Sequence, residues 1–183
     1  MLLFVDTEFT SLADPRLISF AAVDSRGDTF YAVLTDYPHQ ACTAFVRERV
    51  LPVLDAHPAD ARGTQRAVDA AFRRWIEHVQ GNDDSLEIVV DDECDQYLLH
   101  ELTGAHPLGI HGIHARWVLA PLATNAGTLQ RFERYFREAP DRHRHNALDD
   151  ALALRFALAG RQDDNRCRIA DYTDDHPANT GGP

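Results

Sequence analysis

Two pairs of acidic residues occur in the chain where carboxylates can act together in chemistry. Asp6 and Glu8 follow the apolar start of the chain, and residues i and i+2 of an extended strand project to the same side. Two carboxylates that point together raise each other's pKa unless a cation lies between them. A solvated strand end is the simpler interpretation of this short motif alone.

The second pair, Asp95 and Asp150, lies in segments with helical periodicity. Asp95 starts the apolar stripe that continues at Leu98 and Leu99, and a favourable interaction with the helix N-terminus would explain it alone. Asp150 lies in the most apolar segment of the chain, where an unpaired carboxylate is costly. Arg155 is at the wrong offset to pair with it on one helix face. Such a carboxylate is usually paired or bound to a metal.

The four carboxylates are oxygen ligands of the type that Mg²⁺ or Mn²⁺ prefers. Two such ions about 4 Å apart can activate a water and stabilise the leaving oxygen of an in-line phosphoryl displacement. His145 stands five residues before Asp150 and can take a proton from that water, because the free pKa of imidazole is about 6.5. With ten histidines in the chain, an exposed loop histidine is the simpler interpretation of His145 alone.

The sequence also predicts the elements that must position these residues. Short apolar runs bounded by turn residues predict strands at 2–6, 17–23, 29–34 and 86–90. Apolar periodicity and capping residues predict helices at 43–54, 64–79, 93–102, 128–138 and 146–159. Residues 105–127, rich in His, Gly and Pro, are interpreted as a loop with one short strand or helix. This order of elements predicts an α/β domain with a mixed sheet and helices on its faces.

Length and composition limit the class of protein. The 183 residues predict one domain at 1–160 and a polar, loosely ordered tail at 161–183. No apolar run approaches the roughly 20 residues of a membrane span, and the first residues lack the basic start of a secretion signal, so we expect a cytoplasmic protein without a membrane partner. Three cysteines without CxxC spacing predict reduced thiols.

The formal net charge of −11 argues against a polyanionic partner, unless bound cations reverse the sign of an acidic site. All 18 basic residues are arginine. Five arginines precede or adjoin His145: Arg131, Arg134, Arg137, Arg142 and Arg144. Neighbouring acidic residues offset them, so a solvated helix face and a phosphate-guiding strip both remain open interpretations.

Three motifs, together with the three strands predicted before the first helix, resemble those of the DEDDh 3'-5' exonucleases. The first, Asp-x-Glu at the end of a strand, matches residues 5–10, VDTEFT. The second, an aspartate followed by an apolar pair, matches 95–99, DQYLL, and the third, His-x4-Asp opening a helix, matches 145–150, HNALDD. By motif layout the resemblance spans about residues 1–160. Compact bacterial chains similar to ribonuclease T and a small exoribonuclease group resemble it best.

The resemblance implies a ribonuclease H-like α/β fold with a mixed five- to six-stranded sheet and helices on both faces. It implies hydrolysis of single-stranded RNA or DNA from the 3' end to nucleoside 5'-monophosphates, with RNA slightly preferred, and it suggests a homodimer. In this family pattern Asp6, Glu8, Asp95 and Asp150 hold two Mg²⁺ or Mn²⁺ ions, and His145 is the general base.

The same resemblance directs attention to the residues around the motifs. The candidates for substrate binding are Thr7, Phe9, Thr10 and Arg144. Many family members have Thr where this chain has Phe9, whose ring can stack on a terminal base or pack in the core. Many also have Asn where this chain has Asp91, so the usual hydrogen bond at that position is in question.

Two other interpretations remain open. One is a catalytically silent ribonuclease H-like module that binds nucleic acid or a protein, which the intact motifs argue against. The other is a zinc site formed by His111, His114 and His143, although these residues have no recognised ligand spacing. Turnover with Mg²⁺ or Mn²⁺, binding without turnover, and tight zinc binding would distinguish the three.

Overall fold

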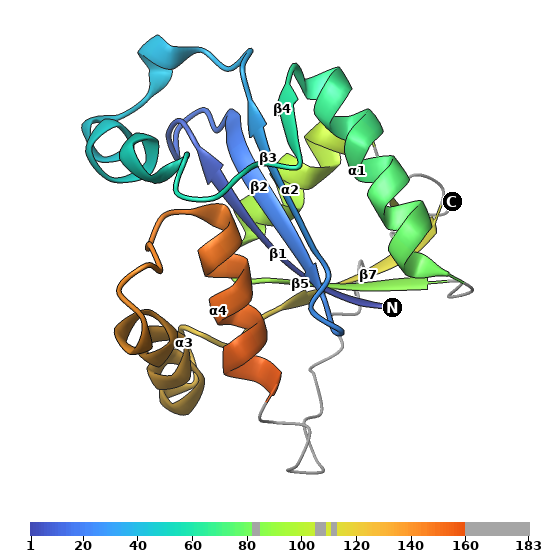
Figure 1. Ribbon diagram of the computed structural model, residues 1–183, viewed down its shortest axis with the longest axis vertical. Coiled ribbons are helices and arrows are strands. Elements are labelled where there is room, and N and C mark those ends of the chain that lie inside the picture. The colour runs from blue at the N-terminus through green and yellow to red at the C-terminus, as the bar shows by residue number, and fades with distance from the viewer. Residues whose placement is uncertain (82–84, 105–108, 111–112, 160–183) are drawn as a thin grey trace, which may run out of the picture.

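The computed structural model describes residues 1–81, 85–104, 109–110 and 113–159, in which a central sheet carries helices on both faces (Figure 1). The strands of the sheet lie in the order β4-β3-β2-β1-β5-β7-β6. Their bounds are β1 Leu2–Phe9, β2 Leu17–Asp24, β3 Thr29–Leu34, β4 Ala61–Gly63, β5 Ser85–Val90, β6 Gly109–Ile110 and β7 Ile113–Leu119. The mixed α/β architecture expected from the sequence is confirmed. The sheet has six strands when the two-residue β6 is left out and seven with it.

Strand β1 joins the two halves of the sheet. It runs antiparallel to β2, which in turn pairs antiparallel with β3. On its other side β1 runs parallel to β5, and β5 runs parallel to β7. Because parallel neighbours end at the same edge of a sheet, the residues that end β1 and those that follow β5 meet there. The register of β1 with β2 shifts between Glu8 and Phe9, at this same edge.

The helices divide between the two faces. They are α1 Gln65–Gln80, α2 Glu93–Thr103, α3 Ala126–Glu138 and α4 Ala147–Ala159. Leu3 and Val5 of β1 pack into a core with α1 and α2, whereas Phe4 packs into a core with α3 and α4. This division follows from the alternation of side chains along a strand. It directs Asp6 and Glu8, which share the parity of Phe4, toward the α4 side.

Helix α4 is buried on most of its circumference, as its nearly continuous apolar sequence predicts. It packs on β1 and β2 and also against α3, and its buried residues include Ala147, Ala151 and Leu154. Two charged residues, Asp149 and Asp150, are also buried in its first turn. The sheet therefore supplies a rigid base for the carboxylates at the start of α4.

Several predicted helix ends are confirmed by their caps. The Thr64 hydroxyl accepts a hydrogen bond from the Ala67 N–H at the start of α1, and Gly104 ends α2 with a left-handed φ of +59°, a conformation that glycine adopts without strain. Helix α3 begins earlier than predicted, because Asn125 caps it by accepting the Thr128 N–H.

Two segments differ from the prediction. The helix expected at 43–54 is a π-helical turn, η2 (Val46–Val50), followed by a 3₁₀ turn, η3 (Leu51–Val53). Pro52 accounts for part of this difference, since proline lacks an N–H and its ring clashes with the carbonyl four residues earlier. Within 105–127, where a loop with one short element was expected, β7 is a seven-residue strand paired with β5. A further 3₁₀ turn, η1, spans His39–Ala41.

Two expectations fall partly or wholly outside the structure. The predicted tail at 161–183 lies outside the described residues. Among the helices that are described, none is long and apolar enough to cross a membrane.

Candidate metal centre

The adjoining ends of β1 and β5 bring three carboxylates together. Asp6 lies on β1, Asp91 follows β5 directly, and Asp95 lies in the first turn of α2. One carboxylate oxygen from each lies within 4.8 Å of the others. Asp91 was noted in the sequence only as a departure from a family pattern. Its position after a buried strand was the available signal, but the sequence does not reveal that this strand is parallel to β1 and next to it.

Asp95 is held in place by three hydrogen bonds. The Thr7 N–H and hydroxyl donate to its Oδ1 at 3.0 and 2.6 Å, and the Asp92 N–H donates to its Oδ2 at 3.2 Å. The Asp92 side chain reciprocates by accepting from the Cys94 N–H, which forms a capping box at the start of α2. The helix-terminus interpretation of Asp95 is therefore correct, and the same contacts fix its carboxylate in the acidic group.

A second group combines Glu8 of β1 with His145 and Asp150 at the start of α4, again with ligand atoms within 4.8 Å of one another. The Asp150 Oδ2 accepts the His145 N–H at 2.7 Å, and its Oδ1 accepts from Arg144 at 3.2 Å. Asp150 thus has an ion-pair partner just before its helix. Arg155, the residue considered from the sequence, instead donates to a carbonyl in the β2–β3 turn.

The pKa values of these carboxylates are displaced upward. Burial, followed by repulsion from Asp150 and Asp95, raises the pKa of Asp6 and that of Glu8 well above their usual range. Burial and Asp91 raise the pKa of Asp95 in the same way. Burial raises the pKa of Asp150 to about 7, against the opposing effect of Arg144. Nearby protein cations therefore do not compensate the ionised cluster.

The donor set fits divalent metal ions. The Asp6 Oδ2 is buried and has no hydrogen-bond partner among the described residues, as expected of an atom reserved for a cation. Clustered carboxylate oxygens are the ligands that hard divalent ions take, and such ions supply the positive charge that the raised pKa values call for. The carboxylates at the ends of β1 and β5 and the start of α4 thus form a centre able to hold divalent metal.

His145 lies beside this centre in an unusual backbone conformation. Its φ is +66°, the one positive value among the described residues other than glycine, and its ring makes an edge-on contact with Phe45 at 4.9 Å between centroids. Burial, with added repulsion from Arg144 and Arg49, lowers the pKa of His145. The imidazole is therefore neutral near pH 7, the form that accepts a proton.

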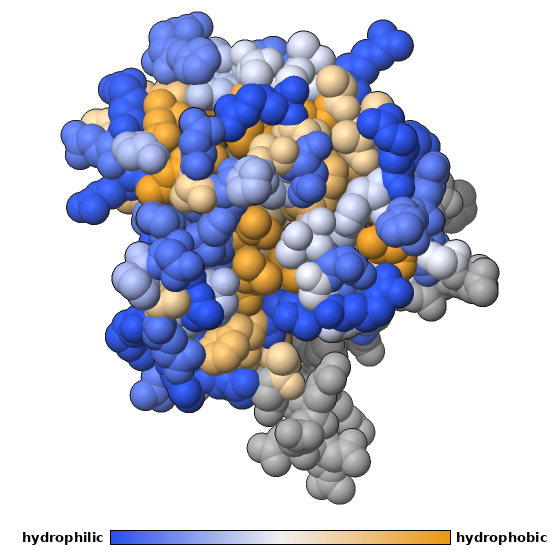
Figure 2. Space-filling model, in the orientation of Figure 1, coloured by the Kyte–Doolittle hydropathy of each residue, from blue (hydrophilic) through white to orange (hydrophobic). Residues whose placement is uncertain are grey.

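A hollow of about 580 Å³ adjoins His145. Its lining comes from η2, η3 and the segment before α4: Phe45, Glu48, Arg49, Pro52, Val53, Arg142, His143, Arg144 and His145. Phe45 is 53% exposed, and the surface over this part of the chain shows hydrophobic side chains among charged ones (Figure 2). Phe45 and Arg49 carry no motif, so sequence reasoning missed them.

The four predicted substrate-binding residues take different positions. Thr7 is buried with its hydroxyl on Asp95. Thr10 is buried and binds the 14–16 segment through its hydroxyl. Phe9 is partly buried and packs against the α1/α2 core. Arg144 alone of the four is half exposed and lines the hollow.

Most arginines before α4 have structural partners. Arg131 donates to the Phe156 carbonyl, and Arg134 pairs with Glu138. Arg142 donates to a carbonyl of α3 and stacks over an aromatic ring there. For most of these arginines the contacts favour a helix surface over a phosphate-guiding strip. Arg142 and Arg144 line the hollow.

The three histidines of the zinc site considered from the sequence differ in what the structure describes of them. His111 lies outside the described residues, and His114 lies on β7. Among the described residues, His143 groups instead with His57 and Asp149.

Comparison with solved structures identifies a similar fold. The crystal structure of cell-death related nuclease 4 matches with a TM-score of 0.55 and 18% sequence identity, over 90% of this chain and 64% of that one. The chain thus spans less than two thirds of that protein's length. No protein-family profile matches the sequence, and a search of curated proteins finds no match. The structural likeness shows a shared fold, and it confirms the ribonuclease H-like α/β class that the sequence motifs predicted.

Proposed function

We propose that this protein is a two-metal-ion 3'-5' exonuclease that hydrolyses single-stranded nucleic acid to nucleoside 5'-monophosphates. The observation that carries the proposal is the convergence of uncompensated carboxylates beside a neutral histidine. These carboxylates are Asp6, Glu8, Asp91, Asp95 and Asp150. The shared fold with a protein described as a nuclease supports the same conclusion.

Each of the two acidic groups would hold one metal ion. Asp6, Asp91 and Asp95 would bind one ion, and Glu8 and Asp150 would bind the second. When bound, the ions supply the positive charge that neutralises a phosphodiester and stabilises its leaving oxygen. The proposal adds Asp91 to the predicted ligand set. Its carboxylate stands where many members of the resembled exonuclease family have the neutral amide of Asn.

His145 acts as the general base in this proposal. Its neutral ring accepts the proton of the attacking water, and the hydrogen bond from the His145 backbone N–H to Asp150 holds the residue beside the carboxylates. Arg144, which contacts Asp150 at 3.2 Å, is placed to stabilise negative charge on the phosphate.

The hollow beside His145 is the proposed binding site of the terminal nucleotides. Phe45 offers an exposed ring on which an unpaired base can stack, and Arg49, Arg142 and Arg144 offer charges for the phosphates. A splayed single strand can use such a ring, whereas a base inside a duplex cannot. The slight preference for RNA, the homodimer and the cytoplasmic location remain predictions from the sequence. A silent module is disfavoured because the ligands and the base are all present.

The proposal is tested with purified protein, Mn²⁺ and 5'-labelled RNA and DNA oligomers. We expect a ladder of products shortened from the 3' end, and much slower cutting of 3'-phosphorylated oligomers, because the added charge lies where the terminal hydroxyl must sit. Asp150→Asn should lose nearly all turnover, while Asp141→Asn, an exposed neighbour, should keep it. Near-normal turnover in Asp150→Asn, or equal cutting of circular single strands, would overturn the proposal.

A further inference from the structure

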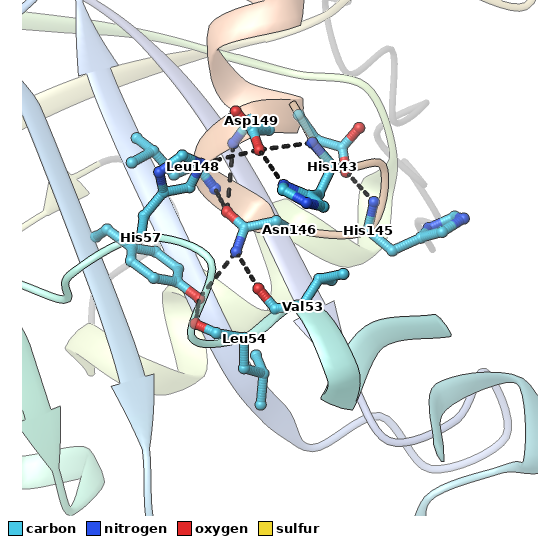
Figure 3. A network of polar contacts seen from close by, with 10 residues as sticks. Val53, Leu54, His57, His143, His145, Asn146, Leu148 and Asp149 are labelled. Atoms are coloured by element: carbon cyan, nitrogen blue, oxygen red, sulfur yellow. Dashed lines mark hydrogen bonds and ion pairs between the residues drawn. The ribbon is translucent and has the colours of Figure 1, made fainter. Parts of the chain in front are cut away.

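A second cluster of metal-ligating side chains lies at the start of α4, apart from the carboxylate centre. It consists of His57, from the turn after η3, with His143 and Asp149 (Figure 3). We propose that these three residues form a binding site for a zinc-type transition metal ion, with at least one further position open to water.

The spacing of the three donors matches a small tetrahedral ion. The His57 Nε2 lies 2.9 Å and the His143 Nδ1 lies 3.7 Å from the Asp149 Oδ2, and all three ligand atoms lie within 4.8 Å of one another. Ligands about 2.0–2.1 Å from zinc at tetrahedral angles stand roughly 3.3 Å apart. The two distances to the Asp149 oxygen lie on either side of this value, so side-chain rotation alone can complete the geometry.

One atom of the cluster lacks the partner that its burial requires, and a buried carboxylate lies beside it. The Asp149 side chain is 2% exposed, and its ion-pair partners within the described part of the chain are these two histidines. The His143 Nδ1 is buried and has no hydrogen-bond partner among the described residues. A cation between the three would satisfy both the buried carboxylate and the unpartnered ring nitrogen.

The chain holds the ligands in position without the ion. The His143 N–H donates to the Asp149 Oδ2 at 2.8 Å, and Asn146 ties the same loop to the Val53 carbonyl at 2.8 Å. His57 and Asp149 are far apart in sequence, so a bound ion would link the turn after η3 to α4. This preorganisation lowers the entropic cost of binding.

The ligand types separate this site from the carboxylate centre. Two imidazoles and one carboxylate suit zinc, whereas Mg²⁺ prefers oxygen donors only. Adjacent residues of a helix point in different directions. Asp149 therefore lies with His57 and His143, and Asp150 lies with Glu8 and His145. The His145 ring likewise points away from the His57–His143–Asp149 cluster (Figure 3).

The test uses the full chain with excess Mg²⁺, which occupies the oxygen-rich centre, and Co²⁺ as a spectroscopic probe. We expect one equivalent of Co²⁺ to give the visible absorption of a four- or five-coordinate ion, and Zn²⁺ to abolish it. Zn²⁺ should also raise the melting temperature under these conditions, since it binds the folded state.

His57→Ala and His143→Ala should each weaken Zn²⁺ binding at least roughly 100-fold, while His78→Ala, an exposed histidine on α1, should bind as the wild type does. Asp149→Asn removes the charged ligand but keeps an acceptor for the His143 backbone N–H, so the loop before α4 should be preserved. The proposal is overturned if the wild type shows no such absorption, or if His57→Ala and Asp149→Asn both titrate like the wild type. Neither outcome depends on nuclease activity.

Discussion

Replacing Asp150 by asparagine should stabilise the metal-free protein at alkaline pH. Asp150 is 6% exposed, and its pKa is raised from 3.8 to about 7, by burial first of all. A group that binds its proton more tightly in the folded than in the unfolded state lowers stability once the pH exceeds its unfolded pKa. The full penalty is reached above the folded pKa. A shift of about three units corresponds to about 4 kcal/mol at pH 8.

Asparagine cannot ionise, so the Asp150→Asn variant avoids this penalty. It retains an acceptor for the His145 N–H but loses the ion pair with Arg144, which offsets part of the gain. We therefore expect a net stabilisation on the order of 2 to 3 kcal/mol at pH 8. For a chain of this size that is an increase in melting temperature of roughly 4 to 12 °C.

The assay is thermal unfolding in a chelator at pH 5 and pH 8, with Asp141→Asn as the control for loss of an exposed charge. At pH 5, only about 1.2 units above the unfolded pKa of 3.8, the penalty falls to about 1.6 kcal/mol, so the difference between the proteins should shrink. Mn²⁺ should raise the melting temperature of the wild type more than that of the variant. The reasoning is refuted if Asp150→Asn is less stable than the wild type at pH 8, or if the difference is the same at both pH values.

Three further predictions address other contacts. Asp24→Asn should destabilise the fold by about 1 to 3 kcal/mol in denaturant unfolding at pH 7. Although burial raises the pKa of Asp24, hydrogen bonds from Arg26 and the turn outweigh this effect and lower it, so the loss should shrink as the pH falls through the folded pKa. Asn146→Ala should cost about 1 to 3 kcal/mol, because its side chain accepts the Leu148 N–H and donates to the Val53 carbonyl. Arg49→Gln should raise the pKa of His145 and move the acidic limb of the turnover–pH profile to higher pH, whereas an unchanged limb would exclude this electrostatic contact.

The sequence predicted the parts of the fold that local patterns determine. The first three strands begin at or within one residue of their predicted positions, because each is an apolar run bounded by turn residues. The segment 43–54 was predicted as a regular helix from its periodicity, which does not register the local effect of Pro52 on hydrogen bonding. Within 105–127 the sequence allowed a short strand or helix but did not locate β7, because its apolar residues alternate with His and Arg and its pairing with the distant β5 stabilises it.

The candidate site was predictable where residues share one element and not where they meet through the fold. Asp6 and Glu8 could be paired from strand geometry, but the proximity of Asp91 depends on the parallel alignment of β1 and β5. On its own helix the sequence offers Asp150 only Arg155, at the wrong offset for a pair, whereas Arg144 reaches it from the loop before α4. Phe45 approaches His145 across about one hundred residues of sequence, which no local pattern encodes.

The two kinds of pairing made by β1 have a consequence for the order of folding. Pairing with β2 closes a loop of only a few residues, whereas the contact of Leu3 with Ile88 closes one of more than eighty. With a tenfold difference in loop length, the second closure costs about 2 kcal/mol more in chain entropy, so the antiparallel strands should form first and β5 should join them later. Asp150 follows last, in α4. A chain emerging from the ribosome therefore completes its set of carboxylates only after nearly all of the described residues have been synthesised.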